Sequence, residues 1–357
     1  MTLAPAKVET VRERPRGPAL KVREHRIGEV DALRGIAAVG VMVFHYTLAA
    51  GGKGGWETLL WGRFGVQLFF IISGYVILMT VRRASGAADF AVSRAARLYP
   101  AFWVACGLTY FAVAMWDPAW RVDAWEAGAN LLMVQIRHMR PIDGVYWTLH
   151  QEMFFYMIMF GLLVLTGWGV RVRGRRPVDL AQTAMALAVL TSLIGLRFSA
   201  WFSLFLIGMV LFDSREGWGW RHAVLLALCG VDVVVRSMRP AMVDHDEIVG
   251  WAYPVVVAVC TLMVFAATRW RMPWLTNRVL LFLGAVSYPL YLLHARIGFI
   301  VLRWIRGAGV EAIAAAGLTC LVMIALAAAV HYLIEAPAQR VVKGWWRRRR
   351  GAETVRR

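Results

Sequence analysis

Long apolar runs recur along this chain from Val30 to Ile334, and they constrain its fold more than any other feature. Hydrophobic residues make up 59% of the 357 residues, whereas a soluble globular chain is usually nearer half apolar. A helix needs about 20 apolar residues to cross the hydrocarbon core of a bilayer. The sequence therefore predicts an all-α polytopic membrane protein, a bundle of about ten transmembrane helices.

The predicted spans are separated by short polar or basic breaks. They cover residues 30–50, 64–81, 99–116, 149–168, 179–196, 198–213, 221–236, 249–268, 279–303 and 312–334. We expect one membrane domain over residues 27–337. Basic cytoplasmic tails, 1–26 and 338–357, flank it, and their low apolar content predicts disorder or contact with lipid.

The net charge of +18 comes from 40 Lys and Arg against 22 Asp and Glu. Of these 40 basic residues, 28 lie in the two termini and in the loops on the same side of the predicted bundle. This asymmetry predicts that both termini are cytoplasmic and that the protein is multi-pass in a bacterial-type inner (plasma) membrane. Attraction to anionic membrane lipid accounts for the charge, and we expect no nucleic-acid partner.

The first span contains ionisable residues in the stretch "DALRGIAAVGVMVFH", which runs from Asp31 to His45. Asp31 can cap the helix, and Arg34 can snorkel to the interface or pair with Asp31. His45 follows Arg34 by eleven residues, so the two share a helix face about 16 Å apart along the axis. A lone buried His is often only a hydrogen-bonded core residue, but an ionisable residue inside a span is a functional candidate.

An inner layer of basic residues is predicted at the cytoplasmic side. Arg94 and Arg97, in "SRAARLYP", lie just before the span at 99–116 and would share a helix face. As an alternative, they are ordinary positive-inside charges. Together with Arg34 they suit the phosphates of a cytoplasmic donor, because guanidinium forks match phosphate oxygens.

An outer layer of titratable residues is predicted at the depth of His45. Glu152 opens one span in "YWTLHQEMFFY", and His294 lies about fifteen residues into the span 279–303. A histidine with a carboxylate suits general-base activation of a hydroxyl group. Other polar side chains of the same span lie near this layer: Tyr288, Tyr291 and Arg296.

Two residues are assigned structural support. Ser73, beside Gly74 in "GVQLFFIISGYVI", is interpreted as a small residue that lets helices approach, since nothing in its context activates it as a nucleophile. Asp31 is expected to hold Arg34 in place.

Six segments in this order resemble the acyltransferase-3 family of integral-membrane acyltransferases. They are DALRGIAAVGVMVFH, FFIISGYVI, RAARLYPAFW, YWTLHQEMFFY, SYPLYLLH and IEAP, spread over residues 31–337. The family's first motif is an Arg or Lys followed, after ten intervening residues, by a His, and Arg34 and His45 match this spacing. The resemblance implies a bundle of ten or eleven helices that O-acylates a carbohydrate or related hydroxyl acceptor. The donor it implies is acetyl-CoA or another acyl-CoA.

The resemblance also implies functional residues, among them an essential His45. We expect His45 to act as general base, and Glu152 to orient its imidazole or hold the acceptor. We expect Arg34, Arg94 and Arg97 to bind the phosphates of acyl-CoA, and no metal to be required. The acceptor, a carbohydrate or glycolipid, is expected to contact Trp147, Tyr288, Tyr291, His294 and Arg296.

A proton-coupled transporter or flippase of a glycan or lipid is the alternative function. Intramembrane His, Glu and Arg serve proton-coupled transport as well. Such a transporter would show repeat symmetry and helices broken at mid-membrane, and the sequence predicts neither.

Overall fold

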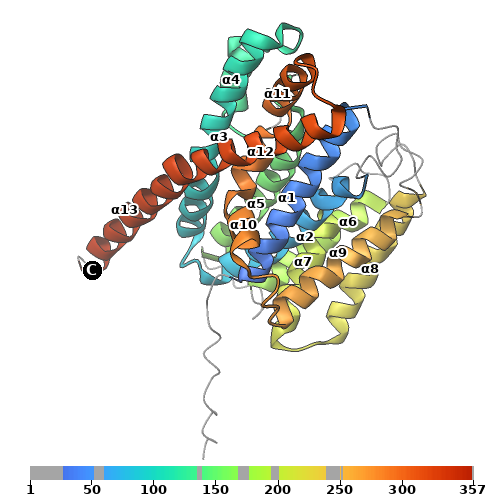
Figure 1. Ribbon diagram of the computed structural model, residues 1–357. Helices are drawn as coiled ribbons and strands as arrows, with labels where there is room; N and C mark the ends of the chain where they lie inside the picture. The colour runs from blue at the N-terminus through green and yellow to red at the C-terminus, as the bar shows by residue number, and fades with distance from the viewer. Residues whose placement is uncertain are drawn as a thin grey trace, which may run out of the picture.

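The computed structural model describes residues 27–51, 60–134, 139–167, 177–193, 201–238 and 250–355 except 251, so the tail 1–26 lies outside the described residues. This part of the chain is helical and contains no strand (Figure 1). The helices are α1 (Gly28–Ala49), α2 (Gly65–Arg83), α3 (Ala87–Trp116), α4 (Ala124–Asn130), α5 (Trp147–Gly167), α6 (Pro177–Leu193), α7 (Phe202–Asp213), α8 (Trp220–Ser237), α9 (Ala252–Arg269), α10 (Arg278–Leu293), α11 (Arg296–Gly307), α12 (Ala312–Val330) and α13 (Ala336–Val355).

Six of the described helices are long and apolar enough to cross a membrane, or seven if the bent pair α10–α11 is one span. The prediction of an all-α, multi-pass membrane protein is therefore confirmed. The number of about ten crossings remains a prediction. At 12 residues, α7 is about 18 Å long, well short of the roughly 30 Å hydrocarbon core.

The span predicted at 279–303 is broken, so the expectation of one unbroken helix there is wrong. α10 ends at Leu293, α11 begins at Arg296, and the two axes differ by 83°. Side chains satisfy backbone groups at the break. The Tyr46 hydroxyl donates to the His294 carbonyl, and the Asp143 carboxylate accepts the Arg296 N–H at 2.9 Å. Non-helical backbone is tolerated at membrane depth where protein groups satisfy it in this way.

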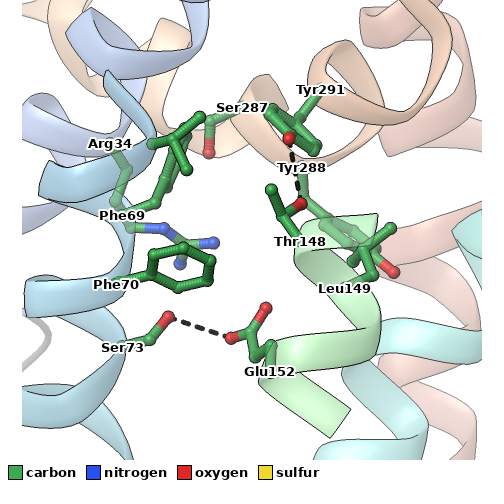
Figure 2. A pocket seen from close by; sticks show the side chains of 11 residues that line it. Arg34, Phe69, Phe70, Ser73, Thr148, Leu149, Glu152, Ser287, Tyr288 and Tyr291 are labelled. Carbon is green, nitrogen blue, oxygen red and sulfur yellow. Dashed lines mark hydrogen bonds between the residues drawn. The ribbon is translucent and has the colours of Figure 1, made fainter. Parts of the chain in front are cut away.

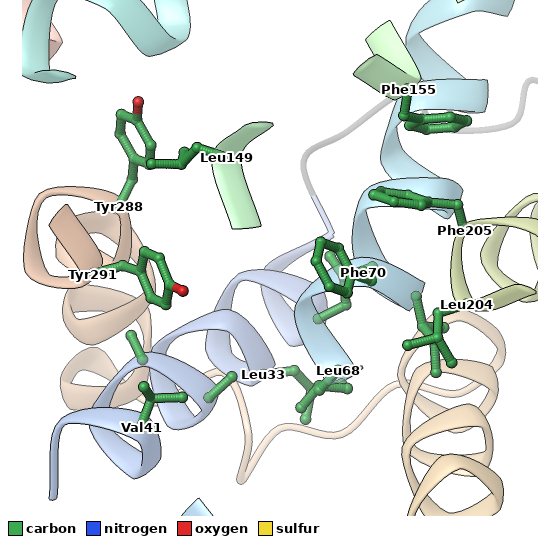
Figure 3. Close-up of a cluster of buried hydrophobic side chains, with 14 of the residues drawn as sticks. Leu33, Val41, Leu68, Phe70, Leu149, Phe155, Leu204, Phe205, Tyr288 and Tyr291 are labelled. Carbon is green, nitrogen blue, oxygen red and sulfur yellow. The ribbon is translucent and has the colours of Figure 1, made fainter. Parts of the chain in front are cut away.

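Glycines set the closest helix crossings. A Cβ on Gly74 of α2 would lie 2.0 Å from the Phe205 carbonyl oxygen, and one on Gly208 of α7 would lie 2.0 Å from the Ile71 carbonyl oxygen. Beside this crossing, the rings of Phe155 and Phe205 stack with centroids 4.4 Å apart (Figure 3). The α2–α7 contact therefore depends on small residues, as in other membrane helix pairs.

A second glycine crossing joins α1 and α10. A Cβ on Gly35 would lie 2.6 Å from the Gly284 nitrogen, and one on Gly284 would lie 2.3 Å from the Asp31 carbonyl oxygen. This close approach brings the His45 face of α1 against the end of α10.

Polar contacts gather the start of α1 and several helix ends at one end of the bundle. Arg82 at the end of α2 pairs with Asp213 at 2.8 Å, and Arg269 at the end of α9 donates to Ser214. The Met272 N–H donates to Glu29 in the first turn of α1. We call this the basic end. At the opposite end, Arg303 pairs with Asp117 at 3.0 Å.

For residues 338–357 the sequence predicts disorder or contact with lipid. The described part of this tail is a helix, so disorder is wrong there, and contact with lipid stays a prediction. After one π-helical turn at His331–Glu335, α12 continues as α13 (red in Figure 1). The tail was expected to be disordered because its composition is polar, but α13 packs along α3, and tertiary contacts stabilise a helix that composition alone does not predict.

Candidate active site

A cavity of about 690 Å³ opens beside His45, and we call it the His45 cavity. It lies between α1, α2, α5 and the break between α10 and α11. Its walls combine aromatic rings with a few polar groups. The lining includes Phe44, His45, Arg63, Phe64, Gln67, Asp143, Trp147, Trp201, Tyr291, Arg296 and Phe299. A concave, mostly apolar site with a few converging polar groups is typical of a small-molecule site.

The two histidines of the predicted outer layer touch, whereas Glu152, predicted at the same depth, lines a separate cavity together with Arg34. His45 Nδ1 lies 3.0 Å from His294 Nε2, and His294 Nδ1 lies 2.8 Å from the Tyr291 carbonyl oxygen. The carbonyl can only accept, so His294 Nδ1 carries the proton and, in the neutral ring, Nε2 accepts. His45 Nδ1 is then the donor, which leaves the lone pair of the His45 ring on Nε2.

A smaller cavity of about 50 Å³, the Glu152 cavity, lies nearer the basic end. Its walls include Arg34, Ser73, Glu152 and Tyr288 (Figure 2). The Ser73 hydroxyl donates to Glu152 Oε1 at 2.9 Å, and the Tyr156 hydroxyl donates to the same oxygen.

The two cavities adjoin. Val66 and Tyr291 line both of them, so the cavity at Arg34 and the cavity at His45 share part of a wall. The Tyr291 hydroxyl lies between them as well, where it accepts a hydrogen bond from Thr148 at 2.9 Å.

Of the predicted basic layer, Arg34 lines the Glu152 cavity, and Arg94 and Arg97 lie near it on α3. The charges of Arg97, Asp31 and Glu152 act on the partly buried Arg34 side chain. Arg94 lies beside Tyr156 and Glu152, and its buried Nε atom has no hydrogen-bond partner. Leaving a buried donor without an acceptor costs free energy. Such an unpaired donor is expected where a bound ligand supplies the acceptor.

The remaining predicted residues divide between the two cavities. Trp147, Tyr291 and Arg296 line the His45 cavity. Tyr288 instead lines the Glu152 cavity, and its hydroxyl donates to the Leu98 carbonyl at 3.0 Å, which ties α10 to α3. Asp31 lies in the first turn of α1, three residues past its start at Gly28, rather than at the capping position.

Sequence reasoning missed several polar residues of the His45 cavity. Gln67 is 7% exposed, and its Oε1 atom has no hydrogen-bond partner. An amide inside the apolar run "GVQLFF" is the signal that could have identified it. Arg63 and Trp201 fall outside the predicted motifs, and only the packing of α1, α2 and α7 brings them to this cavity.

Asp143, also missed, lies just before the apolar helix that contains Glu152. Its carboxylate accepts the backbone N–H groups of Val145 and Arg296, so it joins the start of α5 to the start of α11. Burial raises the pKa of Asp143 to about 6, although these two donors and the charge of Arg296 oppose the shift.

In the part of the chain that the structure describes, no three His, Cys, Asp or Glu residues are arranged to hold a metal ion.

A bundle of apolar helices that encloses a His pair, carboxylates and partly buried arginines defines a multi-pass membrane protein with an internal site. The profile of the acyltransferase-3 family, described as an acyltransferase domain, matches residues 27–332. This chain therefore belongs to the acyltransferase-3 family.

One relative among curated proteins is the exopolysaccharide production protein ExoZ of Rhizobium meliloti (strain 1021). The two are 32% identical over 111 residues, which cover 29% of this chain and 35% of that protein. The chain thus matches about a third of the length of this relative. No solved structure matches this chain.

Proposed function

We propose that this protein is an O-acyltransferase of the inner (plasma) membrane, with both termini in the cytoplasm. It moves an acyl group, acetyl by preference, from cytoplasmic acyl-CoA to a hydroxyl of a carbohydrate or glycolipid. The family supports acyl transfer, and the relative named for exopolysaccharide production supports a carbohydrate acceptor.

The hydrogen bond between His45 and His294 is the observation that carries the proposal. It holds the His45 ring in the tautomer whose Nε2 lone pair is available for a proton. In the proposed reaction, Nε2 takes the proton of the acceptor hydroxyl while that oxygen attacks the thioester carbonyl. The carbon–sulfur bond breaks, and the proton on His45 passes to the departing thiolate.

The donor is assigned to the basic end. Arg34, Arg94 and Arg97 bind its phosphates, and the pantetheine arm follows α1 toward His45, about three helical turns away. The Glu152 cavity of about 50 Å³ is too small for an extended arm. The hydrogen bond between Ser73 and Glu152 joins α2 to α5 across this route. The arm can therefore pass only when that bond breaks and the two side chains separate.

The acceptor is assigned to the His45 cavity. Trp147 and Trp201 lie at its wall with ring centroids 5.1 Å apart and ring planes tilted by 42°, so each offers an aromatic face on which a sugar ring can stack. The unpaired Gln67 amide oxygen is positioned to accept from a sugar hydroxyl, which would satisfy it.

The break between α10 and α11 is a feature that the transporter alternative also requires. Here its backbone groups are bonded to Tyr46 and Asp143, and His294 at the break bonds to His45. This arrangement supports a site built for proton transfer to one fixed base, and we retain acyl transfer as the function.

The test is acyl transfer from radiolabelled acetyl-CoA to a membrane glycan extract by purified protein. We expect His45→Ala to fold, to bind acetyl-CoA and to lose transfer. His222→Ala is the matched control, because His222 bonds to Asp213 at the basic end and lines neither cavity. Full transfer by His45→Ala would refute the role of the base, and glycan uptake without acetylation by the native protein would favour the transporter.

A further inference from the structure

The helix formed by α12 and α13 is longer than a membrane crossing requires. Residues Ala312–Arg350 form 39 consecutive helical residues, about 58 Å in length, against a hydrocarbon core of roughly 30 Å. Since α12 is apolar, the excess length falls on α13, which contains the run "KGWWRRRR". In Figure 1, α13 extends away from the bundle past α3.

Side chains anchor α13 to the first turn of α3. The Trp346 indole N–H donates to Asp89 Oδ1 at 2.9 Å, and Arg350 pairs with the same oxygen at 3.1 Å. Arg94 and Arg97 follow Asp89 by five and eight residues, so they lie on α3 within about two helical turns of this anchor.

The anchor places further positive charge beside the donor arginines. Lys343 is half-buried, and the charges of Arg94, Arg97 and Arg347 act on it. Arg347 lies one helical turn after Lys343, on the same face of α13. Grouping like charges at a partly dehydrated position is unfavourable unless an anion offsets them.

Two carboxylates lie near these cations. Glu335, whose charge also acts on Lys343, accepts from His331 at 2.8 Å and from Gln339 at 3.0 Å. Glu152 accepts from Ser73 and Tyr156. The buried Arg94 Nε atom still has no partner, although both carboxylates are near.

We propose that α13 is part of the donor site, where Lys343 and Arg347 bind the phosphates at the nucleotide end of acyl-CoA beside Arg94 and Arg97. The inference rests on the proposed function. It adds the C-terminal helix to a site otherwise formed by α1 and α3, and it makes Asp89, through Trp346 and Arg350, a positioning residue. CoA has a diphosphate and a separate 3′-phosphate. Its anionic groups can therefore contact cations on both α3 and α13.

The experiment measures initial rates of acetyl transfer by the full chain in uncharged phosphatidylcholine nanodiscs. We expect Lys343→Gln to raise the KM for acetyl-CoA about tenfold with kcat retained, because one charged phosphate contact is lost. Lys343→Arg should keep the KM within a few-fold. Arg348→Gln removes the same charge five residues later on a different face of α13, and it should leave the KM unchanged.

Asp89→Asn tests the anchor. It should raise the KM for acetyl-CoA by less than Lys343→Gln, again with kcat retained, since the variant loosens α13 without removing a phosphate ligand. A fall in kcat at unchanged KM would overturn the positioning role.

Other outcomes separate this inference from the proposed function. If the native protein transfers acetyl groups and Lys343→Gln has the native KM, α13 is not part of the donor site, while the function stands. If Lys343→Gln differs from the native protein only in nanodiscs that contain anionic phosphatidylglycerol, α13 binds lipid and the inference is overturned. If the native protein neither binds CoA nor transfers acetyl groups, the proposed function itself fails.

Discussion

The role of His45 depends on the residue that it contacts. In an apolar helix, a histidine is as readily a core residue as a base. The contact with His294, 249 positions away in the chain, distinguishes the two nitrogens of the ring and directs its lone pair. This is the same logic by which a carboxylate orients the histidine of a hydrolase triad.

The role of His294 can be tested by two substitutions. His294→Leu removes the acceptor for His45 Nδ1, so we expect kcat for acyl transfer to fall on the order of 10²-fold. His294→Gln places an amide oxygen near the former Nε2 position and should recover part of that loss. The measurement is kcat with the KM for acetyl-CoA as internal control, which should stay near the native value. Equal rates for the Leu and Gln variants would mean that His294 only fills space.

At the scale of the helices, the position of the site depends on close crossings. The α2–α7 contact places Gln67 and Ser73 of α2, and it allows no side chain at Gly74 or Gly208. A methyl group at either position would overlap a backbone carbonyl, which cannot move without shifting a helix.

Gly74→Ala should therefore destabilise the protein by about 1–3 kcal/mol or more. Gly161→Ala is the control, because a Cβ on Gly161 of α5 meets nothing within 4 Å. That variant should be neutral or gain up to about 1 kcal/mol of helix stability. Thermal unfolding in detergent, followed by the fluorescence of a thiol-reactive dye, compares the two. Similar melting temperatures for both variants would contradict the crossing.

The broken helix α10–α11 shows the limit of reading spans from hydropathy. The segment 279–303 is mostly apolar, so its composition predicts one continuous helix. The bend of 83° arises because Tyr46 and Asp143 supply partners for the backbone at His294 and Arg296. These partners come from other elements, and hydropathy cannot represent them.

The whole molecule has two distinct ends. The loops after α2, α7 and α9 gather at the basic end with the start of α1, while the loop between α11 and α12 follows Arg303 and its partner Asp117 at the other end. The distribution of Lys and Arg predicts that the basic end faces the cytoplasm.

Cysteine labelling tests this orientation. In intact cells, a membrane-impermeant maleimide should label Ala308→Cys, an exposed position between α11 and α12. Ser85→Cys, an exposed position between α2 and α3, should react only after the cells are lysed. The native chain is the background control, because three of its four cysteines are buried and the fourth is partly buried. The reverse pattern would invert the topology and, with it, the side from which the donor is proposed to enter.

The sequence by itself determined that this is an all-helical membrane protein of the acyltransferase-3 family, and that ionisable residues lie in its apolar segments. The helical membrane class and the positions of the ionisable residues follow from composition and hydropathy, and the family follows from the resemblance of six motifs along the chain. Only the tertiary structure decided that His45 meets His294, that Ser73 and Tyr156 hold Glu152, and that α13 returns to α3. Apart from the bond between Tyr156 and Glu152, which lies within α5, these contacts join helices that are distant in the sequence. They depend on where glycines let helices cross and on which side chains form hydrogen bonds to the backbone at the break between α10 and α11. The residue pattern within one helix predicts neither the crossings nor these hydrogen bonds.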